Sequence, residues 1–332
     1  MLNPKLQLSE KIFKDSVDQI PTRQGYGEGL VKAGMEDPNV VVLCADLTES
    51  TRSILFKEKF PERFVEVGVA EQGMVTVAAG MANYGKIPFV ASYAAFSPGR
   101  NWEQIRTTVA LNNVPVKIAG AHAGLTVGPD GATHQMLEDI ALMRAMPNMI
   151  VLNPCDSVEA EKATLLAAKN GKPTYIRLAR EKTPVMTTKE TKFEIGRADV
   201  FWESKNPQAT IISCGPLLYE ALLAAKELEK NQIEVEVVNM ATIKPIDERA
   251  IVLAAKKTGA IVSVEEHQIN GGLGGAISEV LSKNFPVPME FIGMPDSFGE
   301  SGNPDELLTK YHMKSEDIVE AVKKVISRKL RS

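Results

Sequence analysis

The chain passes from a strand to a helix within Phe64-Val-Glu-Val-Gly-Val-Ala-Glu-Gln-Gly-Met-Val-Thr-Val-Ala-Ala-Gly-Met-Ala82. Its β-rich start is followed by small apolar residues at helical spacing, which predicts a βα unit. Glu71 is the one charged residue between Gly68 and Gly73, in the apolar part of this run. Burying an ionised carboxylate without a partner is costly, so a buried Glu71 has to be paired, protonated or used chemically. The alternative is a solvated first helical turn, where an acid complements the helix dipole.

The same alternation of strand and helix recurs along the chain. After a polar, loosely helical lead-in over residues 1–21, apolar runs alternate with stretches of helical spacing up to Arg180. Strands that are apolar throughout are typical of parallel sheets covered on both faces. The sequence therefore predicts an α/β, doubly wound domain over residues 22–180. Its strands are expected at 40–44, 64–67, 88–92, 114–119, 149–152 and 174–178, with helices at 70–84, 98–112, 134–145 and 156–169.

A second, smaller α/β series follows a polar, threonine-rich connection. The periodicity stops over residues 181–196, which are interpreted as a linker. It resumes over residues 197–332 and predicts a second doubly wound domain with a mainly parallel sheet. In the first domain, Thr22 is expected to cap the opening helix. The second domain's strands are expected at 209–213, 235–238, 260–264 and 288–292, and its helices at 216–230, 247–257, 273–283 and 315–328.

The composition is that of an ordinary globular protein. Of its 332 residues 44% are hydrophobic, enough for two cores, and a net charge of −4 gives no field that would attract nucleic acid or an anionic membrane. The N-terminus is too polar for a signal peptide, and no apolar run reaches the ~18 residues of a membrane span. Cys44, Cys155 and Cys214 lie beside apolar, strand-like residues, which predicts buried thiols in a reducing compartment. A cytoplasmic location is expected.

Polar side chains gather where the predicted strands end. Ligands of open parallel sheets bind beyond the carboxyl ends of the strands, so these positions are candidates for a site. They hold Asp46 to Ser50, Tyr93 to Phe96, a glycine-rich loop with His122, Asp130 and His134, and finally Arg177 and Arg180.

His122 and His134 are two of only four histidines, and Asp130 lies between them in one loop. Histidine is the side chain best suited to proton transfer near neutral pH. Taken singly, His122 is equally well explained as a core residue and His134 as a helix cap. Together with Asp130 at a strand end they favour a catalytic loop. The loop has too few carboxylates for a dinuclear metal centre, so no metal ligand is expected in it.

Gly271-Gly-Leu-Gly-Gly275 is a weak candidate for a phosphate-binding loop. It opens a predicted helix but lacks both the GxGxxG order and the Lys-Ser/Thr of a P-loop. Close packing at a helix start is the expected role.

Three segments together resemble transketolase: Gly68 to Met74, Asp130 to Gln135, and Asp296 to Gly302. The likeness runs from Arg23 to the end of the chain and corresponds to the pyrimidine-binding and C-terminal domains of that family. It implies a thiamine diphosphate enzyme, in which the C2 carbanion of the cofactor does the carbon–carbon chemistry. The implied reaction is transfer of a two-carbon ketol unit from a ketose phosphate to an aldose phosphate.

The resemblance implies roles at the cofactor for three residues. Glu71 would hydrogen-bond N1′ of the aminopyrimidine and favour the imino form, whose 4′ nitrogen removes the C2 proton. Phe96 and Tyr93 would pack against the pyrimidine ring, although both are equally explained as core residues.

At the donor sugar the resemblance implies a further set of contacts. Arg23, Ser50 and Arg180 would hold the phosphate of the ketose phosphate, a task suited to guanidinium groups and a hydroxyl. Asp130 would bind a sugar hydroxyl. His122 and His134 would contact the C1 and C3 hydroxyls and assist proton transfer.

One part of the family's cofactor site is missing from the sequence. No Gly-Asp-Gly with a downstream Asn occurs, and that motif holds Mg²⁺ and the diphosphate in these enzymes. The chain therefore resembles the C-terminal subunit of a split transketolase. An N-terminal transketolase subunit is the implied partner and would supply the diphosphate and Mg²⁺ half of the site. The resemblance also implies self-association through the pyrimidine-binding and C-terminal domains, in an α2β2 assembly with active sites between chains.

Three alternatives remain open. The β subunit of a 2-oxoacid dehydrogenase shares both domains and the subunit split, but it needs no cationic clamp for a phosphate. Ala70-Glu-Gln and Pro129 are similar to deoxyxylulose-phosphate synthase, where His122 would be unusual. A non-catalytic homologue would bind a partner without turnover, which Glu71 and His134 argue against.

Overall fold

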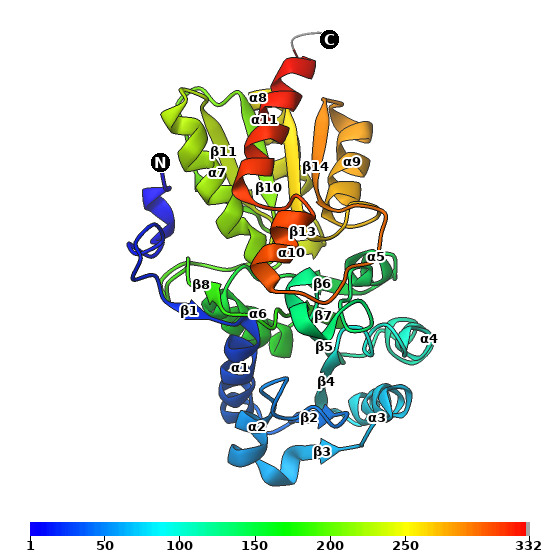
Figure 1. The fold of residues 1–332 in the computed structure, drawn as a ribbon. Helices are drawn as coiled ribbons and strands as arrows, with labels where there is room; N and C mark the ends of the chain where they lie inside the picture. The colour runs from blue at the N-terminus through cyan, green and yellow to red at the C-terminus, as the bar shows by residue number, and fades with distance from the viewer. Residues whose placement is uncertain (330–332) are drawn as a thin grey trace.

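The computed structural model describes residues 1–329 and contains one large sheet in each half of the chain (Figure 1). Both sheets are mainly parallel, so the prediction of two doubly wound α/β domains is confirmed. The first sheet has, in spatial order, β12 (Thr242–Lys244), β6 (Ile150–Leu152), β7 (Thr174–Arg177), β5 (Lys117–Ala121), β4 (Ile87–Tyr93), β2 (Val40–Cys44) and β3 (Phe64–Glu66). Only β12 is antiparallel to its neighbour among these described strands.

Helices cover both faces of the first sheet because its strands alternate side chains between them. On β2, Val40, Val42 and Cys44 pack in one core and Val41 and Leu43 in the other. The first core is closed by α1 (Thr22–Glu36), α2 (Ile54–Lys59) and α6 (Ser157–Lys169). The second is closed by α3 (Glu71–Asn83), by α4 (Trp102–Gln104) with its continuation η3 (Ile105–Ala110), and by α5 (Asp139–Arg144).

The second sheet repeats this plan on a smaller scale. Its spatial order is β14 (Met289–Met294), β13 (Ile261–Gln268), β10 (Ala209–Ser213), β11 (Val235–Asn239) and β9 (Asp199–Trp202), with β9 antiparallel. The helices α7 (Leu218–Lys230) and α11 (Ser315–Lys329) cover one face, and α8 (Glu248–Thr258) and α9 (Leu273–Asn284) cover the other.

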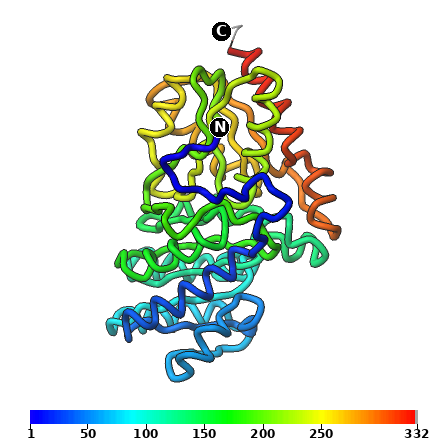
Figure 2. Tube along the Cα trace, turned by 90° about the vertical axis from the view of Figure 1, so that its left-hand side faces the viewer, coloured from blue at the N-terminus to red at the C-terminus, as the bar shows by residue number. Residues whose placement is uncertain are grey.

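Each half of the chain contributes a segment that packs on the other half. β12 follows the predicted linker in sequence but completes the edge of the first sheet beside β6. In the other direction, the lead-in runs along the second domain, as Figure 2 shows, where Leu2 pairs with Trp202 and Ile12 is buried. The short strands β1 (Gln19–Ile20) and β8 (Thr183–Pro184) then pair lead-in with linker. Residues 1–21 and 181–196 are therefore packed segments and not free connections.

Several local predictions are wrong. Thr22 does not cap α1: Pro21 precedes the helix, and the Thr22 hydroxyl accepts the N–H of Ala179 at the end of β7. The helix expected at 134–145 begins only at Asp139, and the lead-in holds a single 3₁₀ turn, η1 (Pro4–Leu6). The sequence analysis also missed β9, β12 and α10 (Pro304–Lys310), along with the 3₁₀ turns η2 (Pro61–Arg63), η4 (Leu125–Asp130) and η5 (Gly215–Leu217).

The three cysteines are buried and free, as predicted. Within residues 1–329, no helix combines the length and the apolarity needed to cross a membrane.

Candidate active site

Glu71 is placed by a short turn between β3 and α3. The carboxylate of Glu66, at the end of β3, accepts the backbone N–H groups of Asp46 and Gly68. Gly68 has a φ of +69°, in the left-handed region that glycine adopts without strain, and the chain turns there. As a result α3 begins at Glu71, with the carboxylate in its first turn.

The Glu71 carboxylate is buried and paired. Its residue is 2% exposed, and Oε2 lies 2.7 Å from Nη1 of Arg100, whose side chain is 47% exposed. The alternative of a solvated helix turn is therefore wrong, and of the three possibilities for a buried carboxylate the structure shows pairing. The Arg100 guanidinium also lies 4.7 Å from the ring centroid of Phe96, which connects Glu71 to the aromatic side chains beyond β4.

Four rings meet beyond the carboxyl ends of β4 and β5. Tyr93 stacks on His122 with 3.9 Å between ring centroids, and it lies 6.0 Å from Phe96 in a nearly parallel arrangement. His134 meets Tyr93 and Phe96 edge to face, at 6.1 and 5.4 Å. The two predicted histidines and the two predicted aromatic residues thus form one cluster, although His122 and His134 come from opposite ends of their loop.

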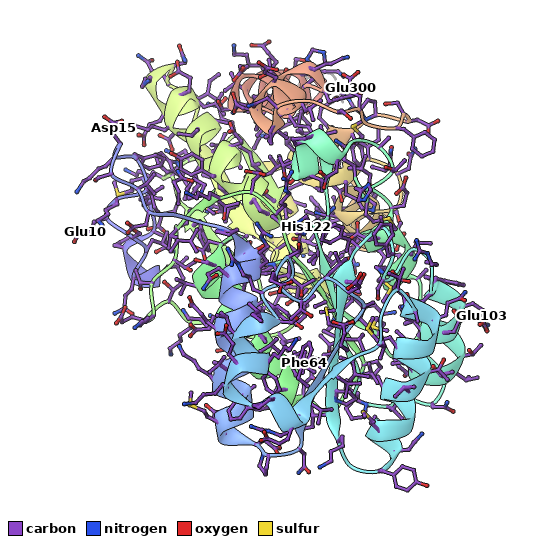
Figure 3. All side chains as sticks on the ribbon, turned by 60° about the horizontal axis from the view of Figure 1, so that its bottom comes forward. Glu10, Asp15, Phe64, Glu103, His122 and Glu300 are labelled. Atoms are coloured by element: carbon purple, nitrogen blue, oxygen red, sulfur yellow. The ribbon has the colours of Figure 1, made fainter. Side chains whose placement is uncertain are left out.

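His122 lies near the centre of the molecule (Figure 3) and is 2% exposed. Burial lowers its pKa to about 3, and the positive charges of Arg23 and Arg180 act in the same direction. The imidazole is therefore neutral at physiological pH, with one nitrogen to donate and one to accept a hydrogen bond. Its Nδ1 atom is buried without a partner among residues 1–329, so the ring keeps hydrogen-bonding capacity for a ligand.

Two arginines border the ring cluster. Nη1 of Arg23, on α1, donates to the backbone oxygen of Ser50 at 2.7 Å, and Arg180 donates to the backbone oxygen of Val127. Burial and the neighbouring Arg52 lower the pKa of Arg23. Arg180 also pairs with Glu181 at 3.7 Å, whereas no ion pair of Arg23 or Arg52 occurs among the described residues. Cations held close together favour an anion between them. Sequence reasoning missed Arg52, since nothing in its spacing separates it from surface arginines.

Asp130 ends η4, in the loop between His122 and His134, and its side chain is exposed. The structure thus places five of the predicted residues around the ring cluster: Arg23, Ser50, His122, His134 and Arg180. Asp130 lies on the same loop as the two histidines. Glu71 is connected to the cluster by Arg100, which pairs with Glu71 and packs on Phe96. Arg177 does not join them. Its guanidinium turns into the domain interface and pairs with Asp139 at 2.8 Å.

The glycine-rich start of α9 does not hold a phosphate-like site. The backbone N–H groups of Leu273 and Gly274 donate to the carboxylate of Glu265 at 2.7 and 2.8 Å. A Cβ on Gly272 would lie 2.0 Å from the same carboxylate, and one on Gly274 would lie 2.5 Å from the Phe291 ring. The predicted role in close packing is confirmed.

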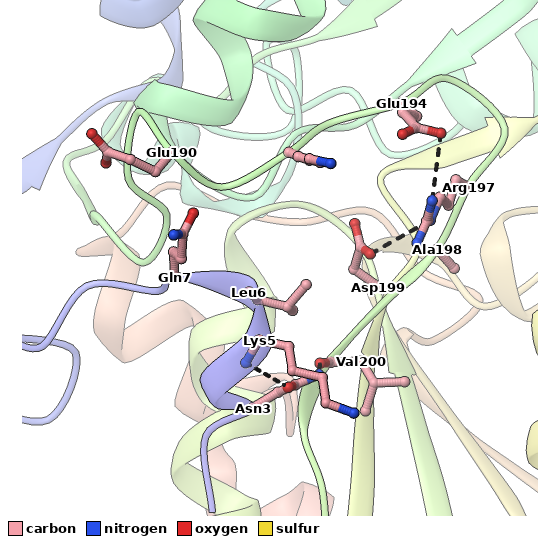
Figure 4. Close-up of a pocket in the computed structure, with 11 residues that line it drawn as sticks. Asn3, Lys5, Leu6, Gln7, Glu190, Glu194, Arg197, Ala198, Asp199 and Val200 are labelled. Carbon is pink, nitrogen blue, oxygen red and sulfur yellow. Dashed lines mark hydrogen bonds and ion pairs between the residues drawn. The ribbon is translucent and has the colours of Figure 1, made fainter.

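A groove elsewhere on the surface contains none of the predicted site residues. It lies between the lead-in and the linker (Figure 4), and its acidic and basic side chains are mixed. Arg197 there pairs with Glu194 at 3.6 Å and with Asp199 at 3.8 Å. No cluster of three His, Cys, Asp or Glu side chains arranged for a metal ion occurs within residues 1–329.

Two protein-family models match the chain. The model of the transketolase pyrimidine-binding domain matches residues 18–186, and that of the transketolase C-terminal domain matches residues 198–318. The two matches correspond to the two halves of the chain, each of which is built on one of the large sheets.

Individual proteins match over nearly the whole chain. A transketolase C-terminal section of Methanocaldococcus jannaschii is 45% identical over 90% of this chain and 94% of its own length. A 6-deoxy-6-sulfo-D-fructose transketolase subunit of Clostridium sp. is 38% identical over 96% and 98%. A solved split-gene transketolase, described as an inactive β4 tetramer, superposes with a TM-score of 0.87 at 44% identity, covering 93% of this chain and 99% of that one. The chain covers only 50% of human transketolase.

Proposed function

Since this chain belongs to the transketolase family and corresponds to its C-terminal half, we propose that it is the catalytic subunit of a two-chain transketolase. The proposed reaction transfers a two-carbon ketol unit from a ketose phosphate to an aldose phosphate. The observation that carries the proposal is the meeting of a buried carboxylate, a cluster of four rings and two arginines beyond the carboxyl ends of one parallel sheet.

The pyrimidine-binding domain implies thiamine diphosphate, and the residues present fit one half of that cofactor. Glu71 is buried, yet its ion-pair partner Arg100 is half exposed and free to move into water. Tyr93 and Phe96 offer aromatic faces next to that pair. When bound, thiamine diphosphate supplies the carbon nucleophile for breaking and forming carbon–carbon bonds. Glu71 would hold N1′ of the aminopyrimidine, and Tyr93 and Phe96 would orient its ring.

The remaining site residues suit a phosphorylated sugar. Arg23 and Arg180, with Ser50, would bind the phosphate. Neutral His122 and the more exposed His134 would bind donor hydroxyls and move protons at them, and Asp130 would bind a sugar hydroxyl at the entrance. The two arginines favour a phosphorylated substrate over the unphosphorylated oxoacid of a 2-oxoacid dehydrogenase.

The diphosphate and Mg²⁺ are assigned to a separate N-terminal transketolase subunit. Two comparisons support a partner: a similar protein is described as a transketolase C-terminal section, and the similar split-gene structure is of an inactive tetramer of β chains. Alone, the chain is expected to bind thiamine diphosphate weakly.

Self-association is proposed through the outer face of α3. Val77 there is 48% exposed, and a Cβ on Gly73 or Gly80 would touch nothing in the chain. Small residues on an exposed helix face allow the same helix of a second copy to approach closely. Val77→Glu should shift the assembly to smaller species in sedimentation velocity, and an unchanged distribution would contradict this interface.

The test of the proposed function is reconstitution. The purified chain is mixed with its candidate N-terminal subunit, thiamine diphosphate and Mg²⁺, and ketol transfer from xylulose 5-phosphate is assayed. Turnover only in the complete mixture supports the proposal. A stable, cofactor-loaded complex without ketol transfer would overturn it, and tight cofactor binding by this chain alone would overturn the division of the site.

A further inference from the structure

The loop that carries Asp130 and His134 is held from outside its own domain. Its base is closed by an isolated bridge between Ala123 and Met136, in which the N–H of Gly124 donates to the Met136 oxygen at 2.9 Å. Between these ends lie the η4 turn and the residues up to Gln135. The second domain contacts this loop with specific acceptors.

Glu266 is the first of these acceptors. It lies near the end of β13 in the second domain, is 2% exposed, and its Oε1 accepts the N–H of Thr126 at 2.7 Å. A Cβ on Gly124 would lie 2.3 Å from the same oxygen, and Gly124 has a φ of +96°. The loop therefore needs glycine at position 124 to bring Thr126 onto the carboxylate.

The other end of the loop is fixed by the Asp296 to Gly302 segment and by Arg177. Nε2 of Gln135 donates to the backbone oxygen of Glu300 at 2.9 Å and to that of Leu125 at 3.1 Å. Nη2 of Arg177 joins the backbone oxygens of Met136, at 3.2 Å, and Glu266, at 2.8 Å. The second domain thus accepts hydrogen bonds from both ends of the loop, at the Glu266 carboxylate near its beginning and at the Glu300 backbone oxygen near its end.

We propose that Glu266 is a positioning residue, through which the second domain sets the place of Asp130 and His134 in the substrate site. This inference rests on the proposed function. A charged acceptor buried against a backbone N–H holds it more firmly than a neutral one or water would. Glu71, Tyr93 and Phe96 lie outside the loop, and of the two residues that Glu266 would position only His134 meets these rings, edge to face. Glu266 therefore acts mainly on the donor sugar and only weakly on thiamine diphosphate.

The test compares Glu266→Ala with Glu266→Gln, whose side-chain oxygen still accepts the Thr126 N–H. The matched control is Glu265→Ala, which also removes a buried carboxylate that accepts backbone N–H groups, but those of α9. Hydrogen–deuterium exchange of the 123–136 loop is measured in the full chain. Ketol-transfer kinetics and thiamine diphosphate affinity are measured in the complex with the N-terminal subunit.

Glu266→Ala should speed exchange in the loop and raise KM for the ketose phosphate by about tenfold or more, with a much smaller effect on cofactor affinity, since His134 meets the cofactor-side rings only edge to face. Glu266→Gln should bring the loop exchange rate and KM most of the way back to the wild-type values. Glu265→Ala should leave the loop exchange rate and KM as in the wild type. Glu266→Asp, which withdraws the oxygen by one methylene, should act in the same direction as Ala and serves if the Ala variant does not fold.

Unchanged loop exchange in Glu266→Ala, or equal loop exchange in Glu265→Ala, would overturn the positioning role. So would a Glu266→Gln variant as defective as Glu266→Ala. If the wild-type complex showed no ketol transfer, the proposed function would fail by itself, while loop exchange would still decide whether Glu266 positions the loop.

Discussion

Glu71 and Glu265 are two buried glutamates whose surroundings differ: Glu71 begins α3, whereas Glu265 lies on β13 and faces the start of α9. Each carboxylate oxygen of Glu265 accepts a hydrogen bond from a backbone N–H at the start of α9, so both oxygens are satisfied within the protein. Glu71 has one ion-pair partner, and that partner is half exposed. Burial raises the pKa of Glu265, and the bonds from α9 and nearby positive charge oppose the rise. The carboxylate of Glu265 completes the fold, whereas that of Glu71 can exchange its partner for a ligand.

The same contrast separates arginines and histidines. Arg177 bonds to Asp139 and to two backbone oxygens in the domain interface, whereas Nε of Arg23 is buried without a partner among the described residues. His267 is fully buried with both ring nitrogens engaged, by the Gln268 oxygen and the Ala141 N–H. His122 keeps a free nitrogen.

Burial alone therefore does not mark the site. Buried polar groups are normally satisfied within the protein, and those that are not indicate a place for a ligand or for chemistry. Nε of Arg23 and Nδ1 of His122 are unsatisfied and lie beyond the first sheet. By contrast, the ring of His267 and the guanidinium of Arg177 are engaged between the domains. Unpaired atoms also occur between the domains, at Oδ1 of Asp139 and Oε1 of Gln268, so the comparison holds for these pairs and not for every buried group. The comparison can be tested by substituting a residue whose polar groups are free for a ligand and measuring the effect against a variant of a residue whose polar groups are satisfied within the protein.

The largest effect is expected for Glu71→Ala. Loss of the carboxylate should lower ketol transfer by the reconstituted complex by about 10²–10⁴-fold, the range for removing a group that controls a proton. The melting temperature should change little, because Arg100 is already half exposed and can be hydrated. Steady-state kinetics with xylulose 5-phosphate and a thermal melt of the free chain check both expectations.

Glu265→Ala is the reciprocal control, with turnover near that of the wild type. If Glu71→Ala kept full turnover, or if both variants lost it equally, the distinction between the two glutamates would be wrong. A non-catalytic homologue would show no turnover to lose in either variant, while keeping its affinity for the partner.

Most of the longer strands and most helices could be predicted because near-continuous apolar runs carry their own signal. Glu71 could also be found, since an acid in an apolar run needs an explanation. Its partner Arg100 could not be found from the sequence, because only the folded connection between β4 and α4 places Arg100 beside Glu71. β12 has only three residues, too few for periodicity, and its place in the first sheet is set by packing. The start of α10 did have a signal: Asn303 caps it and Pro304 follows.

Arg23→Ala should have the second-largest effect. A hydrogen bond to a charged group contributes about 1.5–3 kcal/mol, so KM for a phosphorylated donor should rise by roughly 10–100-fold. An unphosphorylated ketose should be affected far less, because it has no phosphate for Arg23 to hold. The loss of the hydrogen bond to Ser50 and of the charge near His122 affects both donors alike. Kinetics with both donors measure the difference.

Arg63→Ala is a cleaner control for this change than a variant of Arg177, which touches the 123–136 loop. Arg63 donates to the backbone oxygens of Gly34 and Asp37 and stacks on Phe60, so its loss should cost stability without raising KM. Equal loss with both donors in Arg23→Ala would argue against a phosphate contact.

A smaller effect, on stability alone, is expected for Glu265→Ala. The variant leaves two N–H groups at the start of α9 without their acceptor, at a cost of about 1–3 kcal/mol. For a chain of this size that lowers the melting temperature by a few degrees, roughly 2–6 °C. Differential scanning calorimetry measures it. A melting temperature equal to that of the wild type would mean that water replaces Glu265 and that its role is not structural.

The smallest effect is the dependence of stability on pH at His122. Its folded pKa of about 3 lies below the ordinary value of about 6.5, so the unfolded chain binds a proton that the folded chain excludes. The contribution of His122 to stability is therefore complete above about pH 6.5 and is lost as the pH falls toward 3. Between about pH 7.5 and about pH 5.5 it should fall by about 1 kcal/mol.

His122→Asn is the variant for this test, because His122 has a φ of +54° and asparagine tolerates that left-handed conformation. Urea unfolding at the two pH values should show a loss in the wild type that exceeds the loss in His122→Asn by that amount. Equal losses would mean that His122 binds a proton in the folded chain as readily as in the unfolded chain. The ring would then become charged beside Arg23 and Arg180 once the pH falls below about 6.5, and burial would not keep its nitrogen neutral there.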